Sequence, residues 1–287
     1  MKPTLYLTCI LLCYLYACNN YKTSGVEEVI EDIRYTKIFE SKASDYYSKN
    51  GGTSSDTYKK QLLNEKCEVK LDSILHEANG SQNFYTTHKH QVLIYGKMYN
   101  CGNCPEWHIS AATAFPISDD GICASNYHVF DSYNPDSSED YETSFVMDLK
   151  KNIYPIVEVL AASKKDDLAI FRINCEPNTI KPLVLGNDLV NGGDVCLISH
   201  PDSRYYTFTQ GILNRTYIKP KEGILRQSMS AAFARGSSGA PVLDSTGKVV
   251  GIVAGTSPVF RNGNPSEGHQ MIVNEIVPVS RLRALIN

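Results

Sequence analysis

A serine between glycines is the first feature of this sequence that could carry out chemistry. It lies in the segment Ala234-Arg235-Gly236-Ser237-Ser238-Gly239-Ala240-Pro241-Val242. Glycines on both sides allow a tight turn that exposes a hydroxyl group and directs neighbouring backbone N–H groups at one point, which is how an oxyanion is stabilised. Most serines in glycine-rich turns are loop residues without a chemical role, so this segment needs support from elsewhere in the chain.

A hydroxyl nucleophile needs a base, and the base needs a carboxylate that orients it. His128 comes directly after the strand-like run that begins at Gly121, and Asp167 comes directly before the apolar run Leu168-Ala169-Ile170-Phe171. The chain therefore holds His, Asp and Ser in that order. A single histidine is more often structural than catalytic, and a triad is defined by geometry rather than by order.

The elements that must position these residues are short strands. From about residue 91, β-branched and aromatic runs alternate with Gly, Asn, Asp and Pro, which is typical of an antiparallel sandwich or barrel. The predicted strands are Val92–Tyr95, Ala111–Pro116, Thr143–Leu149, Ile156–Leu160, Leu168–Ile173, Val195–Ser199, Gly211–Arg215, Val249–Ala254 and Met271–Asn274. Residues 278–286 predict a short C-terminal helix, with Ser280 as a candidate N-cap and an apolar stripe formed by Leu282, Leu285 and Ile286.

Five sequence motifs together resemble the trypsin/chymotrypsin clan of serine peptidases, most closely the protease domain of the HtrA family without an appended peptide-binding module. They occur in collinear order over residues 92–287: Ala112–Phe115 with Asn126–Val129, Asp167–Ile170, Gly193–Pro201, Gln210–Leu213 and Gln227–Ala240. The resemblance implies an all-β fold of two antiparallel six-stranded barrels, at about 91–178 and about 179–287, followed by the short C-terminal helix.

The resemblance also implies roles for single residues. Ser238 would be the nucleophile, His128 the general base and then acid, and Asp167 its orienting carboxylate. The backbone N–H groups of Gly236 and Ser238 would form the oxyanion hole, where removal of one donor typically costs about 10²–10³ in turnover. This chemistry requires no cofactor and no metal.

The register of the motifs decides between neighbouring candidates. Gly-x-Ser-Gly-x-Pro selects Ser238 rather than Ser237, and Asp-Leu-Ala-Ile selects Asp167 rather than Asp166, which we expect to be solvated. Ser237 stands where the family usually has Asp or Asn, and Ala240 where it often has Gly. Both side chains are small, so neither departure is expected to disable the site.

The resemblance places the specificity pocket among Ala232, Phe233, Gly251, Gly255 and His269. The pocket base, near Ala232, carries no acidic residue, which gives no support to selection for Lys or Arg. We expect an uncharged side chain of small or medium size before the scissile bond. His269 leaves acidic specificity open as an alternative, because glutamate-selective relatives carry a histidine near this position.

The first ninety residues precede the peptidase-like region. Residues 1–17 hold an apolar run that suits an export signal and is too short to span a bilayer. Leu15-Tyr16-Ala17-Cys18 resembles a bacterial lipobox, which would place a lipid on Cys18; the alternative is ordinary cleavage after Ala17. We expect 18–90 to be a tether and a partly helical N-terminal extension, flexible over 48–56 and with an amphipathic helix over 61–75.

Six cysteines remain after Cys18: Cys67, Cys101, Cys104, Cys123, Cys175 and Cys196. An even number in an exported protein favours structural disulfides, although the sequence determines no pairing. Free or buried thiols are the second interpretation. Cys101 and Cys104 could instead form half a zinc site with His108 or a redox pair, but no second close cysteine pair supplies a fourth zinc ligand. Cys123 is close enough to His128 to brace the catalytic strand.

Composition excludes one class of function. The 287 residues hold 28 Lys and Arg against 31 Asp and Glu, a net charge of −3, without the basic excess of a nucleic-acid-binding domain. The sequence thus predicts an exported serine endopeptidase, acting on a peptide or protein substrate and lipid-anchored in the bacterial cell envelope, on its periplasmic or outer-surface side.

Two other functions stay open. One is a catalytically inactive peptidase-fold binding module at the cell envelope. The other, weaker, is a thiol oxidoreductase centred on Cys101 and Cys104, around which no βαβ pattern is present. The sequence favours no particular oligomeric state.

Overall fold

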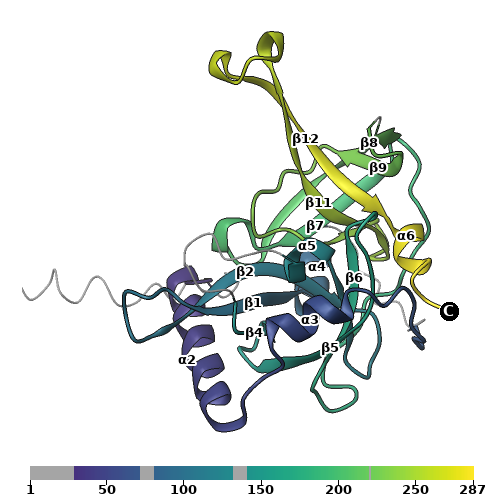
Figure 1. The fold of residues 1–287 in the computed structure, drawn as a ribbon. Coiled ribbons are helices and arrows are strands. Elements are labelled where there is room, and N and C mark those ends of the chain that lie inside the picture. Colours follow the sequence, from purple (N-terminus) through teal and green to yellow (C-terminus); the bar gives the residue numbers. More distant parts are fainter. Residues whose placement is uncertain (1–28, 72–80, 132–140, 220) are drawn as a thin grey trace, which may run out of the picture. The chain divides into compact units, whose positions relative to one another are not determined.

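The computed structural model describes residues 29–71, 81–131, 141–219 and 221–287 (Figure 1). The expected signal peptide over 1–17 and Cys18 lie outside the described residues. The chain divides into two compact units, Met1–Glu31 and Asp32–Asn287, and the second contains every element named below. Within the described part of the chain, none of the helices combines the length and the apolar character that crossing a membrane requires.

Six antiparallel strands close into a first barrel (Figure 1). In barrel order they are β1 (Leu93–Asn100), β2 (Trp107–Pro116), β3 (Ile122–Ser125), β6 (Leu168–Ile173), β5 (Ile153–Ser163) and β4 (Thr143–Met147). The interior is apolar and partly aromatic. Phe130 lies edge-on to both Tyr95 and Phe171, with ring centroids 5.3 Å and 5.4 Å apart, a geometry that aromatic rings favour.

Six further strands close into a second barrel. Their order is β10 (Pro241–Leu243), β11 (Val249–Phe260), β12 (His269–Pro278), β9 (Ile224–Met229), β8 (Thr207–Lys219) and β7 (Asp194–Ser199). Its core is built from aliphatic side chains such as Leu197, Leu213, Val242 and Ile276, all fully buried. The predicted fold class, two six-stranded barrels with a short C-terminal helix, is confirmed.

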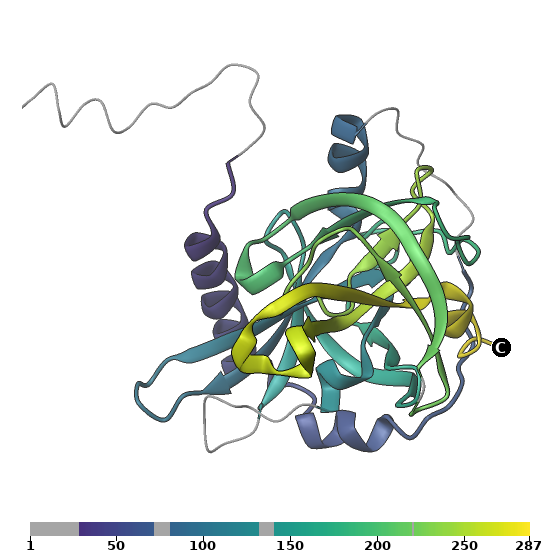
Figure 2. The same ribbon diagram turned by 90° about the horizontal axis from the view of Figure 1, so that it is seen from above.

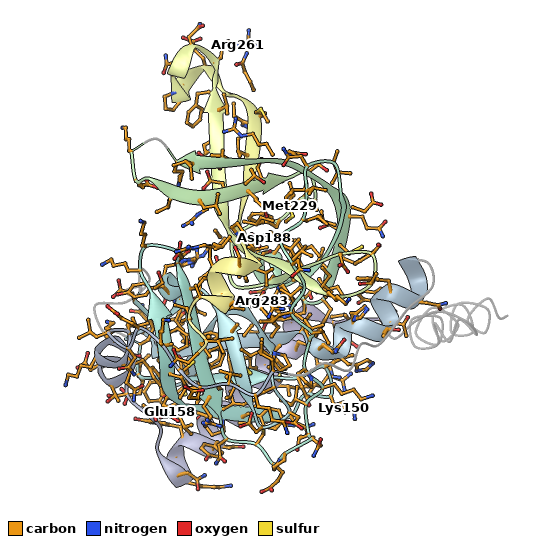
Figure 3. The ribbon with its side chains drawn as sticks, turned by 90° about the vertical axis from the view of Figure 1, so that its right-hand side faces the viewer. Lys150, Glu158, Asp188, Met229, Arg261 and Arg283 are labelled. Carbon is orange, nitrogen blue, oxygen red and sulfur yellow. The ribbon has the colours of Figure 1, made fainter. Side chains whose placement is uncertain are left out.

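The hairpin of β11 and β12 continues beyond the second barrel as a two-stranded arm (Figure 3). Ser257–Phe260 pairs with residues 269–273 of β12, whereas β9 pairs only with Asn274–Ile276. The tip holds the two short 3₁₀ turns η3 (Arg261–Gly263) and η4 (Pro265–Glu267). Several apolar side chains of the arm are exposed to solvent, namely Val259, Met271 and Ile272.

The N-terminal extension packs on the first barrel through the helix α2 (Asp32–Asn50), which lies beside β1 and β2 (Figure 2). Its buried side chains Tyr35, Phe39 and Ala43 recur every fourth residue, so they form one stripe. Phe39 fills the space over Gly96, where a Cβ atom would lie 2.6 Å from the phenylalanine ring. This position therefore needs glycine.

The prediction of a flexible segment over 48–56 is wrong. The helix α2 continues to Asn50, and a second helix, α3 (Ser55–Gln61), starts after a short connection. Ser54 caps α3, because its hydroxyl oxygen accepts a hydrogen bond from the N–H group of Thr57. The polar and glycine-rich composition marks a helix–helix junction rather than a mobile tether.

The prediction of a helix over 61–75 is also wrong for its described part. Only Gln61 is helical, as the end of α3, and residues 62–71 are irregular. Cys67 instead pairs with the C-terminus: its N–H group donates to Leu285 O at 3.0 Å, and its carbonyl accepts from Asn287 N at 3.0 Å. Hydrogen bonds to a segment far away in sequence have replaced those of a local helix.

Two further helices are α4 (Ser81–His88), which leads through the 3₁₀ turn η1 (Lys89–Gln91) into β1, and α6 (Val279–Arg283). The latter confirms the C-terminal helix but not its predicted cap. Ser280 lies inside the first turn, and its N–H and Oγ–H groups donate to the Asp188 carboxylate at 2.8 Å and 2.6 Å. Asp188 is labelled next to α6 in Figure 3.

Candidate active site

His128 is placed by the end of β3. The four residues of that strand are fully buried in the first barrel, and the one-turn helix α5 (Tyr127–Asp131) follows almost at once. Val129 and Phe130 face the barrel core. Because two neighbours are buried, the imidazole of His128 is turned outward, and 47% of its side chain is exposed.

Asp167 lies in the turn between β5 and β6, in the left-handed region of backbone conformation, with φ of 62°. A non-glycine residue is uncommon there, and such a conformation costs on the order of 1–3 kcal/mol. The side-chain amide of Asn126 donates to the Asp167 carbonyl at 2.8 Å and so helps to hold this backbone. Asn126 is itself fully buried next to His128.

The His128 ring contacts the Asp167 carboxylate closely. Nδ1 lies 2.8 Å from Oδ2 and 3.0 Å from Oδ1, and the backbone N–H group of His128 donates to Oδ1 at 3.0 Å. An ionised carboxylate only accepts hydrogen bonds, so the proton of the neutral ring sits on Nδ1 and leaves the Nε2 lone pair available. This is the state in which an imidazole can take a proton from a hydroxyl group.

The segment Gly236–Ser238 is bound to the first barrel by Thr113 of β2. The Thr113 N–H group donates to Ser238 O at 3.0 Å, and its hydroxyl donates to Gly236 O at 2.8 Å. Gly236 has φ of 92°, and a Cβ atom there would lie 2.4 Å from His200 O. Both observations require glycine, as the motif predicted.

Two backbone N–H groups beside Ser238 have no internal acceptor within the described residues, those of Gly236 and of Ser238 itself. The amides that alternate with them are used: Ser237 N donates to Ala234 O at 3.0 Å, and Gly239 N donates to Val253 O at 3.2 Å. Two unpaired amides next to a half-buried serine that lines a pocket are positioned to bind a developing oxyanion.

His128 and Ser238 line one pocket, of about 240 Å³. Its remaining walls come from both barrels: Lys97, Ser110, Ala111, Ala112, Val129, Tyr141, Arg235 and Gly236. A neighbouring pocket of about 200 Å³ shares part of this lining and adds Tyr99, Ile109, Asp202 and Ser203. The space in front of the triad candidates is thus bordered along one side by strand β2.

The residues predicted for the specificity pocket do not line the pocket that holds His128 and Ser238. Ala232 is exposed and Phe233 is half-buried against the core of the second barrel. Gly251 is buried, and a Cβ atom there would lie 3.0 Å from Ile276 Cδ1. In contrast, no atom lies within 4 Å of a Cβ at Gly255. His269 is exposed on the two-stranded arm, opposite Phe260.

The expectation that Asp166 is solvated is wrong. Only 5% of the residue is exposed, and Arg281 of α6 binds its carboxylate with two hydrogen bonds, Nε to Oδ1 at 3.0 Å and Nη2 to Oδ2 at 2.8 Å. The adjacent aspartates therefore have separate partners: Asp167 holds His128, and Asp166 holds the C-terminal helix against the turn between β5 and β6.

His200 lies under the segment that carries Ser238. The ring is fully buried, which lowers its pKa to about 3, and Nδ1 accepts a hydrogen bond from Tyr206 N at 3.0 Å. The role of this residue and that of Thr113 were not predicted. Both lie inside motifs quoted from the sequence, but which hydroxyl or carbonyl meets Gly236 depends on how the barrels pack.

The six described cysteines are free thiols, so the preferred interpretation as structural disulfides is wrong for the described residues. Cys123 is fully buried in β3, where burial raises the pKa of its thiol. Its buried place within β3, the strand that leads to His128, agrees with a packing role. Cys101 and Cys104 lie close together, with their sulfur atoms 3.3 Å apart.

Comparison with protein families and curated proteins points to one family. Residues 112–252 match the model of the trypsin-like peptidase domain. The chain is 30% identical over 155 residues to serine protease HTRA1A of Danio rerio, which covers 51% of this chain and 30% of that protein. It is 29% identical over 153 residues to serine protease HTR4 of Bos taurus. The matched part therefore spans less than a third of these relatives.

Solved structures show the same fold. "Crystal structure of Deg5" matches with a TM-score of 0.52 and 20% identity, covering 70% of this chain and 90% of that one. "HtrA-type protease AlgWS227A with tripeptide" matches with a TM-score of 0.54 and 21% identity, covering 71% of this chain and 62% of that one. At such identities the likeness concerns the fold.

Proposed function

We propose that this chain is a serine endopeptidase that cleaves peptide bonds through an acyl-enzyme on Ser238. The match of residues 112–252 to the trypsin-like peptidase domain and the similarity to HtrA proteases support this proposal. One observation carries the proposal: an imidazole paired with a carboxylate at 2.8 Å opens onto the same pocket as the serine hydroxyl. A binding module of the same fold would have no need for this pair.

The proposed steps use the pair of His128 and Asp167 and the serine that lines the same pocket. His128 Nε2 takes the proton of the Ser238 hydroxyl as Oγ attacks the carbonyl carbon, and later gives it to the leaving amine. Asp167 keeps Nδ1 protonated and stabilises the imidazolium that forms. Water then attacks the acyl-enzyme, with His128 again as base, and releases the second product. General acid–base transfer of this kind contributes about 10²–10⁴ in rate.

The negative charge that develops on the carbonyl oxygen is stabilised by the amides of Gly236 and Ser238. Among the described residues neither amide has an internal acceptor, which supports this role. The two hydrogen bonds from Thr113 keep the segment in place before substrate arrives. Preorganised donors of this kind avoid the energetic cost of turning dipoles during the reaction.

We propose that the side chain before the scissile bond is uncharged and small or medium in size, accommodated near Ala232, Phe233, Gly251 and Gly255. Open space at Gly255 and the absence of an acidic side chain among these residues support this choice. The alternative of acidic specificity loses support, because His269 lies on the exposed arm.

We also propose that the protein is exported, with residues 1–17 as the signal and a lipid on Cys18. The apolar run and the lipobox-like sequence support this proposal. Mass spectrometry of the mature protein from its own cells tests it: a diacylated or triacylated peptide beginning at Cys18 is expected, and a chain that still begins at Met1 would contradict export.

A fluorophosphonate probe tests the nucleophile directly. We expect it to label the native chain on Ser238, to label Ser266→Ala equally, because that serine is exposed at the tip of the arm, and to leave Ser238→Ala unlabelled. Ser237→Ala tests the register: it should still react, because the Ser237 hydroxyl is buried and paired with Ser199 Oγ at 3.0 Å. Labelling of Ser238→Ala would contradict the assignment of Ser238 as the nucleophile. A native chain that is labelled but cleaves no peptide would favour a binding module.

A further inference from the structure

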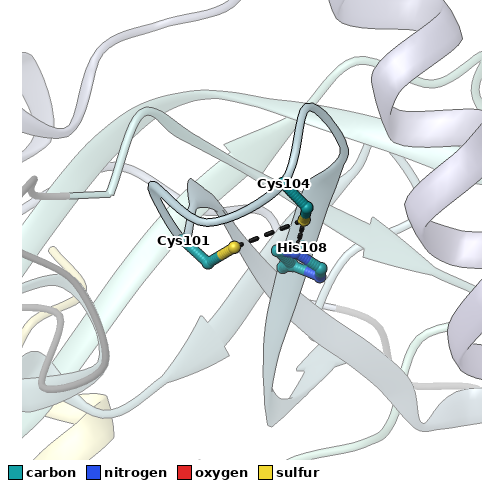
Figure 4. A group of neighbouring side chains, drawn as sticks. All are labelled: Cys101, Cys104 and His108. Atoms are coloured by element: carbon teal, nitrogen blue, oxygen red, sulfur yellow. Dashed lines mark hydrogen bonds between the residues drawn. The ribbon is translucent and has the colours of Figure 1, made fainter.

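Three soft or borderline donor atoms gather at the end of the hairpin formed by β1 and β2 (Figure 4). The sulfur of Cys104 lies 3.3 Å from that of Cys101 and 3.0 Å from Nε2 of His108. All three donor atoms lie within 4.8 Å of one another, and all three residues are half-buried. This cluster takes no part in the proposed peptidase chemistry.

Thiolate and imidazole donors select zinc among the common divalent cations, whereas magnesium and calcium require oxygen. A tetrahedral zinc ion has Zn–S distances of about 2.3 Å and Zn–N distances of about 2.0–2.1 Å, which separates its donor atoms by about 3.5–3.8 Å. The sulfur–sulfur and sulfur–nitrogen separations of 3.3 Å and 3.0 Å are slightly shorter. Small side-chain movements would admit the ion.

A carboxylate lies near the other nitrogen of the imidazole ring. Nδ1 of His108 lies 3.5 Å from Oε1 of Glu40 on helix α2, on the opposite side of the ring from Cys104. Histidines that bind metals usually present their other ring nitrogen to a carboxylate, a carbonyl or water, which fixes the tautomer. In a redox pair of cysteines neither the histidine nor this carboxylate would be required.

We propose that Cys101, Cys104 and His108 bind one zinc ion, with the fourth position taken by water and Glu40 as the positioning residue of His108. Each thiol releases its proton on binding, so the two thiolates balance the charge of the cation. His108 binds through the Nε2 lone pair and keeps its proton on Nδ1. The proposal does not rest on the peptidase activity.

The site would fix one wall of the substrate pocket. His108 lies opposite Tyr99 across the hairpin, with ring centroids 5.6 Å apart, and the next residue of β2 is Ile109. Tyr99 and Ile109 both line the smaller pocket beside Ser238. A bound ion would tie the hairpin end to α2 through Glu40, and so hold β2 along its course toward Thr113.

Metal binding by the full chain tests the proposal. The reduced protein is freed of metal with a chelator, transferred to chelator-free buffer and titrated with Zn²⁺ against a chromophoric competitor. We expect one ion per chain. Cobalt(II) in place of zinc should give a thiolate-to-cobalt charge-transfer band and the intense visible bands of a tetrahedral ion, neither of which depends on turnover.

Four variants locate the site. Cys101→Ser, Cys104→Ser and His108→Ala should each lose the binding of one zinc ion per chain. With cobalt, each should also lose the charge-transfer band or the visible bands of a tetrahedral ion. Glu40→Gln should bind zinc about tenfold more weakly. Cys67→Ser is the matched control, since this half-buried thiol lies outside the cluster, and it should bind zinc as the native chain does. Circular dichroism shows whether each variant is folded.

Two results would overturn the proposal. One is a reduced native chain that binds no zinc and instead closes a disulfide between Cys101 and Cys104 in air, which would identify a redox pair. The other is binding that survives substitution of both cysteines, which would place the ion elsewhere.

Discussion

Two neighbouring aspartates with different partners give a residue-scale test of the mechanism. Asp167 accepts from both N–H groups of His128, whereas Asp166 is bound to Arg281. We expect Asp167→Asn to lower kcat by about 10⁴ while the fold is retained, because an amide can donate to Nδ1 and so reverse the tautomer.

Asp166→Asn is the matched control for that substitution. It removes a carboxylate from the same turn without touching His128, so the folded fraction should keep a kcat near the native one. Turnover on a chromogenic peptide, normalised to the folded fraction, distinguishes the two. If Asp167→Asn kept a kcat within tenfold of the native value, the assigned role of Asp167 would be wrong.

The buried His200 ring should make stability depend on pH. Burial lowers its pKa from 6.5 to about 3. Between these pH values the ring is protonated in the unfolded chain and neutral in the folded chain. The free energy of unfolding is therefore unaffected by this histidine above about pH 6.5. As the pH falls from there toward 3, the free energy of unfolding decreases by up to about 1.4 kcal/mol per pH unit. Acid should therefore lower the free energy of unfolding.

Two measurements check that expectation. Nuclear magnetic resonance of labelled histidine should show the His200 ring still neutral at pH 5. Urea unfolding at pH 7 and pH 5 should show a smaller loss of stability for His200→Gln than for the native chain, since glutamine cannot be protonated there. A His200 ring that titrates near pH 6.5 in the folded protein would refute the argument.

At the scale of elements, the ion pair between Asp166 and Arg281 joins α6 to the first barrel. Arg281→Ala would leave a carboxylate that is 7% exposed without its cation, and we expect a loss of about 1–3 kcal/mol, less than for a fully buried pair because the arginine is partly solvated. Urea unfolding measures this loss. Arg261→Ala, exposed at the tip of the two-stranded arm, should change stability by no more than about 0.5 kcal/mol.

Strands with strong apolar patterns were predictable from the sequence, and shorter or more polar elements were not. Leu168–Ile173 was predicted with the bounds that the structure has. In contrast, β10 is only three residues long, too short for a periodic pattern. The four residues of β3 were recognised only as a strand-like run ahead of His128, without bounds of their own. The helix α2 was missed because its single stripe of buried residues is interrupted by many polar side chains. Its stability comes from packing on β1 and β2, which local sequence does not encode.

Sequence reasoning could name candidate site residues that lie within motifs, but not contacts that depend on the packing of distant segments. His128, Asp167 and Ser238 could be named because each lies in a recognisable segment. Whether Asp166 is solvated or buried in an ion pair depends on an arginine 115 residues away in sequence. Similarly, no pattern near Thr113 indicates that its hydroxyl crosses to Gly236, because the docking of one barrel on the other decides that contact.

At the scale of the whole unit, α2 is part of the peptidase fold rather than a spacer before it. Phe39 is fully buried over Gly96, and we expect Phe39→Ala to cost about 3–5 kcal/mol by leaving a cavity there. Ile33→Ala, in the same helix but 75% exposed, should be nearly neutral. Urea unfolding compares them, and equal effects would mean that α2 does not stabilise the barrel.

The helix α2 also reaches the segment that borders Ser238. Its Asp32 accepts a hydrogen bond from Tyr205 N at 2.9 Å, and Thr36 Oγ1 lies 2.8 Å from the Tyr205 hydroxyl. A few residues earlier, Asp202 N donates to Arg235 O at 2.6 Å. Loosening α2 should therefore affect turnover as well as stability.

The two-stranded arm is where we expect the protein to cleave itself. Between Ser257 and residue 273 the strands pair only with each other, and an isolated ribbon of this kind is marginally stable in water. Apolar side chains of moderate size, Val259 and Ile272 among them, are exposed there. Concentrated preparations of an active enzyme should therefore nick themselves first within the arm, and the two fragments should remain associated, because β11 and β12 on either side of the cut stay inside the second barrel.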